Sequence, residues 1–175
     1  MCVSTWAEIA TALASWALVC VTIWVVRNQN LLTRSNLCAS LQLQMEEKFD
    51  NPVMLAERSK LAKQLLSDAP HDEIQEGVMN FFETVGTMLR KEYLDPDMTW
   101  SAFSFFAIRW WSACKHYITT ERARQGNDET VFEEFQTLVD RMYEFETKKR
   151  KIPRAQLEPC AKDVTQFLND ERKLV

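Results

Sequence analysis

The chain has 175 residues, enough for one domain of ordinary size and too few for two. It carries 21 lysines and arginines and 25 aspartates and glutamates, a net charge of −4, which does not suit a general nucleic-acid-binding protein. Its three glycines are scattered, which excludes a phosphate-binding loop and a dinucleotide-binding fingerprint. The five cysteines lack Cys-x-x-Cys spacing, so we expect reduced thiols and no disulfide framework.

The N-terminal segment is the most apolar part of the chain. Residues 9–26 are uncharged, and a helix over 6–26 would be about 31 Å long, close to the bilayer core of about 30 Å. Trp6 and Trp24 lie near its two ends, where tryptophan prefers the membrane interface, and Arg27 follows directly. No basic residue precedes the segment and no small-residue cleavage site follows it, so we expect an uncleaved signal anchor.

The charges beside this segment predict its orientation. Arg27 and Arg34 follow the apolar run, so the positive-inside rule places the later residues in the cytoplasm. The sequence thus predicts an external tail at 1–5, a transmembrane helix at 6–26 and a cytoplasmic helical domain at 27–175. The expected location is the bacterial inner membrane, with the lipid bilayer as one partner.

The rest of the chain has helical periodicity and no strand pattern. We expect helix from about residue 6 to residue 49, bent near residues 28–30. A second helix is expected from Asn51-Pro52, a typical N-cap and first helical residue, to about residue 67. Residues 74–89 repeat apolar side chains at four- and three-residue spacing. A further helix begins at Asp95-Pro96, and its broad apolar surface, centred on Trp110, predicts that it is the most buried element.

Two more helices are expected near the C-terminus. Gly126 is expected to end the helix that contains Trp110, and Asn127-Asp128 to cap a helix that continues to about Lys149. A weaker helix should run from about Pro159 to Arg172. The predicted fold class is therefore all-α, with the transmembrane helix continuing into a cytoplasmic bundle of about five to six helices.

One dipeptide suggests catalysis. All-α metal-dependent phosphohydrolases use a His-Asp pair, which His71-Asp72 resembles. Those sites also need an upstream histidine ligand, and no histidine precedes His71. The alternative is a helix-start aspartate beside a loop histidine.

The carboxylates Glu76 and Glu83 lie seven residues apart, with Arg90 seven further, and could perform acid–base chemistry. A solvated helix face produces this pattern more often, and Glu83 could instead form an ion pair with Arg109 or Arg122. We therefore expect no catalytic residue, metal ligand, cofactor or small-molecule substrate.

A run of cations forms a candidate contact with an anionic surface: Lys148, Lys149, Arg150, Lys151 and Arg154. Three interpretations remain open. The run could be a solvated helix end, where cations suit the helix dipole. It could contact anionic lipid headgroups, or nucleic acid, which is the least favoured of the three.

Several segments together resemble a known family. They are Phe81-Phe82-Glu83-Thr84-Val85-Gly86, then Leu94-Asp95, and a helix with Trp110-Trp111 that ends in Ile118 and Arg122. Over residues 6–145 the chain resembles small, uncharacterised, membrane-anchored helical proteins of bacteria and phages, known only as a domain of unknown function. The resemblance implies the helical architecture and no activity.

The function expected from the sequence is a membrane-tethered helical interaction module at the inner face of the membrane. It would present an aromatic-rich bundle to a protein partner or to further copies of itself. The first alternative is a membrane-associated hydrolase of phosphoester or lipid substrates that uses His71, Asp72 and Glu83. The second alternative is a membrane-bound nucleic-acid contact through residues 148–154.

Overall fold

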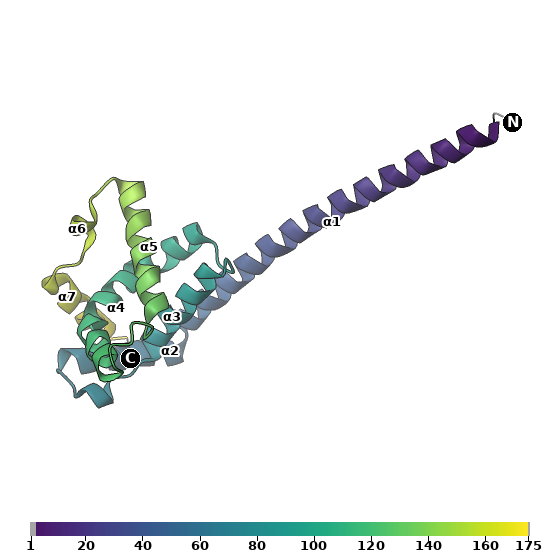
Figure 1. Ribbon diagram of the computed structural model, residues 1–175. Helices are drawn as coiled ribbons and strands as arrows, with labels where there is room; N and C mark the ends of the chain where they lie inside the picture. Colours follow the sequence, from purple (N-terminus) through teal and green to yellow (C-terminus); the bar gives the residue numbers. More distant parts are fainter. Residues whose placement is uncertain (1–2, 175) are drawn as a thin grey trace. The chain divides into compact units, whose positions relative to one another are not determined.

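The computed structural model describes residues 3–174, with side chains placed for 15–30 and 33–174. These residues are all-α, with no strand among them (Figure 1). The chain divides into two compact units, residues 1–39 and 40–175. Helix α1, Val3–Asp50, supplies the first unit and enters the second. The second unit also contains α2 (Pro52–Leu66), the short 3-10 helix η1 (His71–Glu73), α3 (Gly77–Arg90), α4 (Pro96–Arg124), α5 (Glu133–Arg150), α6 (Arg154–Leu157) and α7 (Ala161–Glu171).

The prediction of a membrane-spanning helix needs correction. Within the described part of the chain, no helix is both long enough and apolar enough to cross a membrane. Trp6 and the predicted tail 1–5 lie outside the described side chains. The absence of a membrane-spanning helix among the described residues contradicts the predicted single-pass location in the inner membrane.

The predicted N-caps of α2 and α4 are confirmed. The side-chain oxygen of Asn51 accepts a hydrogen bond from the backbone N–H of Met54 at 2.7 Å. Asp95 accepts in the same way from Met98 at 2.9 Å. In both helices a proline follows the cap, because the first helical position needs no backbone donor.

An aromatic cluster joins the end of α1 to the bundle. Phe49 is buried and its ring lies 4.9–5.8 Å from four other phenylalanine rings, namely Phe81, Phe82, Phe103 and Phe106. At this separation two rings attract each other more than the burial of their apolar area alone would give, since ring edges and faces carry opposite partial charges.

Helix α1 is continuous through residues 28–30, where a bend was expected.

Helix α4 supplies large side chains to the core, but the prediction that it is the most buried element is wrong, because seven of the 14 residues of α3 are buried and only nine of the 29 of α4. Trp110 is fully buried, and its ring meets that of Phe167 on α7 edge-on at 5.2 Å. Phe103 and Ile118 on the same helix are also buried. Gly126 follows α4 with φ +78°, a conformation that suits glycine, so this predicted helix stop is confirmed.

The predicted start of α5 is wrong. Asp128 accepts hydrogen bonds from the backbone and hydroxyl of Thr130 instead of capping a helix. The helix begins five residues later, at Glu133, and the preceding Phe132 is buried with φ 56° and gives no side-chain cap. An aromatic residue in this left-handed conformation is uncommon, so the packing around Phe132 must hold it there.

A buried ion pair attaches the C-terminal helix to α2. Arg58 donates to both carboxylate oxygens of Glu171 at 2.7 Å, and the two side chains are 4% and 6% exposed. The guanidinium lies over the ring of Phe49, 4.2 Å from its centre. Bidentate geometry of this kind offsets part of the desolvation cost of burying two charges.

We predict that Trp110→Ala lowers the free energy of unfolding of the full chain by about 3–5 kcal/mol, as for other buried aromatic side chains. The measurement is urea denaturation followed by circular dichroism. As a control, Tyr93→Ala removes a half-exposed ring and should change stability by less than about 1 kcal/mol. Equal effects of the two variants would show that Trp110 is not central to the core.

Candidate functional site

A cluster of polar side chains surrounds His71. Its Nε2 atom lies 2.6 Å from Oε2 of Glu121 on α4. Its ring stacks on that of Tyr117, one turn earlier on α4, with centres 4.4 Å apart and planes at 22°. Tyr117 in turn donates its hydroxyl hydrogen to Glu76 at 2.8 Å. Residues from η1, α4 and the start of α3 therefore hold one imidazole in a single orientation.

Hydrogen bonds determine the charge state of Glu121. Its pKa is lowered by the hydrogen bond from Gln125 and then by that from His71. Burial raises the pKa of Tyr117, and the hydrogen bond to Glu76 raises it further, so this hydroxyl stays protonated. The cluster at neutral pH is thus a carboxylate that accepts from His71 and a phenol that donates to Glu76.

Asp72 has a different partner from the one a His-Asp metal site would require. Its carboxylate accepts from Arg124 Nη1 at 2.7 Å, and this bond is the main cause of its lowered pKa. Among the described residues, no group of three or more histidine, cysteine, aspartate or glutamate side chains is placed to hold a metal ion. The structure thus pairs His71 with Glu121 and Asp72 with Arg124.

Two hollows adjoin the ring of His71. One, of about 600 Å³, lies between the end of α2, α4 and α7, and its lining includes Leu65, Val164 and Leu168. The other, of about 660 Å³, is more polar and includes Glu76 and the ion pair of Asp72 with Arg124. Both volumes lie within the range of roughly 300–1,000 Å³ typical of small-molecule pockets.

Glu83 has a structural role. Its carboxylate accepts hydrogen bonds from the backbone N–H groups of Phe135, at 2.7 Å, and Glu134, at 3.2 Å. It therefore caps α5 from a neighbouring helix. Burial raises its pKa, and the two backbone donors oppose that rise.

The expected ion pair of Glu83 with Arg109 or Arg122 is not what the structure shows. Arg109 lies over the ring of Phe105, 3.7 Å from its centre, and Arg122 donates to the carbonyl of Val131 at 2.9 Å. Glu83 also lines neither hollow beside His71, so the three residues of the hydrolase hypothesis do not form one site.

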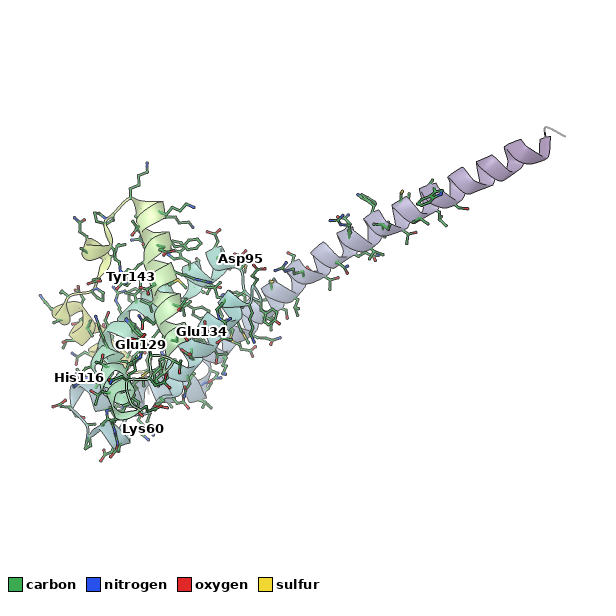
Figure 2. All side chains as sticks on the ribbon, in the orientation of Figure 1. Lys60, Asp95, His116, Glu129, Glu134 and Tyr143 are labelled. Carbon is green, nitrogen blue, oxygen red and sulfur yellow. The ribbon has the colours of Figure 1, made fainter. Side chains whose placement is uncertain are left out.

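Part of the polar face of α3 is a contact surface, on which Glu83 is half-buried and Arg90 stays exposed. Besides Glu83, Arg90 on this face donates to Glu134 at 2.6 Å. Gly86 lies between them, and a Cβ there would overlap the backbone carbonyl of Glu134 (labelled in Figure 2). The absence of a side chain lets α3 and α5 approach closely.

The structure gives most of the basic run local acidic partners. Lys149 lies 3.3 Å from Asp97 and over the ring of Trp100. Arg150 lies 2.7 Å from Glu146, and Arg154 lies 2.6 Å from Asp140. Lys148 and Lys151 are exposed with no acidic partner among the described residues. A contact of the basic run with an anionic surface stays a prediction. The run has less uncompensated positive charge than the sequence alone suggests.

The two residues that hold His71 were not among the predicted site residues. Tyr117 lies seven residues after Trp110, so in the sequence it reads as part of the apolar face of that helix. Glu121 follows it by four residues, so a carboxylate continues that face by one turn. A carboxylate at such a position is a sequence signal for a polar partner, but nothing in the sequence identifies that partner as His71.

The fold and the site define an all-α domain that carries a histidine–carboxylate cluster beside two hollows. The chain belongs to a family described as a domain of unknown function, DUF4760, whose profile matches residues 7–142. No curated protein and no solved structure matches the chain. The match confirms membership of an uncharacterised domain family, as the sequence resemblance implied. The match ends within α5 and leaves all of α6 and α7 beyond its C-terminal limit, since both follow residue 142.

We predict that Glu83→Ala destabilises the chain by about 1–3 kcal/mol, because two backbone donors at the start of α5 lose their acceptor. Glu83→Gln keeps one side-chain oxygen and should cost less than the alanine variant. Urea denaturation gives both values. Glu144→Ala removes an exposed carboxylate from α5, the helix that Glu83 caps; it is the control and should stay within about 0.5 kcal/mol of the unchanged chain. Equal stability of the two Glu83 variants would contradict the capping role.

The basic run gives a second prediction. If it contacts an anionic surface, the full chain should bind anionic vesicles more tightly than a variant with Lys148, Lys149, Arg150 and Lys151 all changed to glutamine. The difference should vanish as salt rises, since the screening length falls from about 10 Å at 0.1 M to about 3 Å at 1 M. Co-sedimentation with vesicles measures it. A solvated helix end predicts no difference, and a nucleic-acid contact predicts a salt-dependent difference with DNA or RNA instead.

Proposed function

We propose that the chain is a helical interaction module whose contact surface is the apolar part of α1. The single observation that supports the proposal is the exposure of large apolar side chains there: Trp16 and Leu18 are each 70% exposed, and Trp24 is 67% exposed. Further exposed apolar residues lie between and beside them, namely Val19, Val21, Ile23 and Val26. A contiguous exposed apolar surface of this kind marks an interaction site.

The proposed contact surface lies on α1, whereas the expectation from the sequence was an aromatic-rich bundle. Most of the large rings of α4 serve the core: Trp110 and Phe103 are buried, and Trp111 is half-buried with its ring 5.1 Å from that of Phe135. Phe105 is the exception, at 53% exposed. The aromatic content of α4 is therefore accounted for by packing within the domain.

The distribution of apolar residues around α1 favours oligomerisation. They follow one another from residue 16 to residue 26, so they occupy every side of the helix. A helix that is apolar on all sides is typically covered on all sides. A further copy of this chain offers the same surface, and symmetric association of identical surfaces is the commonest form of assembly.

The test is the mass of the full chain in solution, measured by sedimentation equilibrium over a range of concentrations. We expect oligomers that dissociate in a variant with Trp16, Leu18 and Trp24 changed to glutamine. The matched control changes Val53, Tyr93 and Met98, which are exposed apolar residues of the second unit, to glutamine and should leave the mass unchanged. Circular dichroism should show the same helical content in all three chains.

Two outcomes would contradict the proposal. In the first, the full chain is a monomer at every concentration. In the second, vesicles of neutral lipid take up the chain without any change in its oligomeric state, and the triple glutamine variant is not taken up. Either result would show that association of α1 with protein is not the function of its apolar surface.

A further inference from the structure

We propose that the hollow between α2, α4 and α7 binds a small, uncharged molecule that has an apolar body and a hydroxyl group, with the hydroxyl donating to Nδ1 of His71. This binding site is independent of the apolar surface of α1, which lies in the other unit. We call it the His71 hollow.

The first argument is the orientation of the imidazole. Glu121 is ionised and can only accept hydrogen bonds, so Nε2 of His71, 2.6 Å away, must carry a hydrogen. In the neutral ring, Nδ1 then holds the lone pair and is an acceptor. Within the described chain Nδ1 has no hydrogen-bond partner, although the side chain is only 23% exposed.

The second argument is rigidity. A flip of the ring about its Cβ–Cγ bond would place Cε1 instead of Nε2 beside Glu121 and lose that hydrogen bond, and the stacking on Tyr117 opposes the rotation. Tyr117 is itself held by Glu76. A polar group fixed before the ligand arrives loses little conformational entropy on binding, which is the usual condition for a specific site.

The third argument is the composition of the wall. Leu65 from α2 and Val164 and Leu168 from α7 contribute to the apolar part of the lining. Its lining includes one carboxylate, Asp68, and among the described residues no lysine or arginine. An anionic ligand would therefore meet like charge and no counter-charge, whereas a neutral donor satisfies the acceptor on His71.

The volume agrees with a ligand of modest size. At about 600 Å³ the hollow is larger than a single ring requires and lies within the range of ordinary ligand pockets. Apolar contact supplies most of the affinity in such sites, and a few polar groups determine orientation. Of two molecules with the same apolar body, the one whose hydroxyl donates a hydrogen bond to His71 should therefore bind more tightly.

Two probes of the same shape test this hydroxyl contact: para-cresol, which has a hydroxyl, and toluene, which lacks it. Binding to the full chain is followed by NMR of the ring nitrogens of the two histidines. Without a probe, we expect His71 to carry its hydrogen on Nε2. We expect para-cresol to shift the Nδ1 resonance of His71 and to bind about five- to tenfold more tightly than toluene, as one hydrogen bond of ordinary strength would give.

Three variants make the test specific. His71→Ala should abolish the preference for para-cresol over toluene. Glu121→Gln retains the packing but can donate as well as accept, so it should mix the two tautomers of His71 and reduce the preference. His116 also lines the hollow, but it is exposed on α4 (labelled in Figure 2), and the structure gives its ring no carboxylate partner to fix its tautomer. His116→Asn should therefore keep the preference.

The proposal is overturned if para-cresol and toluene bind equally, if benzoate or benzylamine binds more tightly than para-cresol, or if His116→Asn removes the preference as fully as His71→Ala does. A folding defect in His71→Ala would be visible as a shifted unfolding midpoint. In that case the decision rests on the tautomer of His71 and on the Glu121→Gln variant. Hydrogen on Nδ1 in the unchanged chain would also exclude the proposed contact.

Discussion

The second unit depends on the contact between α3 and the beginning of α5. The first N–H groups of any helix lack partners within that helix, and α5 has no capping side chain of its own. Glu83 supplies the acceptors from α3, and Gly86, three residues later on the same face, lets the two backbones approach. Buried Phe82 and Phe135, whose rings stack at 5.1 Å, fill the space beside this contact. Glu83 thus supplies the acceptors for the N–H groups of α5, and Gly86, one turn away, leaves the space for its backbone.

This contact also explains the left-handed backbone at Phe132. Such a conformation is unfavourable for an aromatic residue, and here it occurs where the chain must turn into α5 with its ring buried. The hydrogen bonds to Glu83 and the burial of the rings offset that cost. The segment Phe81–Gly86 carried much of the resemblance to an uncharacterised family. It has a packing role here, since Phe82, Glu83 and Gly86 all make this one contact.

Local signals predicted the elements well and their mutual contacts poorly. Asn51-Pro52 and Asp95-Pro96 begin helices because each cap bonds a backbone group three residues away, an interaction contained within the sequence motif. The start of α5 could not be predicted in this way, because its cap comes from a residue about fifty positions earlier. The same holds for His71 and Glu121, whose proximity is a result of tertiary packing.

A charged residue within an apolar stripe is a more general signal than any of these motifs. Arg58 lies on the same side of α2 as the buried Met54 and Leu61, and Glu171 follows Leu168 of α7 by three residues. Each charge on such a stripe requires a buried partner, because an unpaired buried charge is very costly. Arg58 and Glu171 are each other's buried partner. The sequence therefore contained evidence that α2 and α7 pack together, although it gave no register.

The residues of the His71 hollow come from two parts of the chain, one that the family profile matches and one beyond it. The residues that orient the imidazole, Glu76, Tyr117 and Glu121, lie within residues 7–142, the range shared with the family. The wall formed by Val164 and Leu168 lies beyond that range, on the helix that Glu171 attaches to α2. The residues that orient the imidazole thus lie in the part of this chain that the family profile covers, whereas part of the apolar wall comes from the C-terminal helix beyond it. Changes in α7 can consequently alter which apolar body fits without disturbing the histidine, provided that the ion pair of Arg58 with Glu171 is retained.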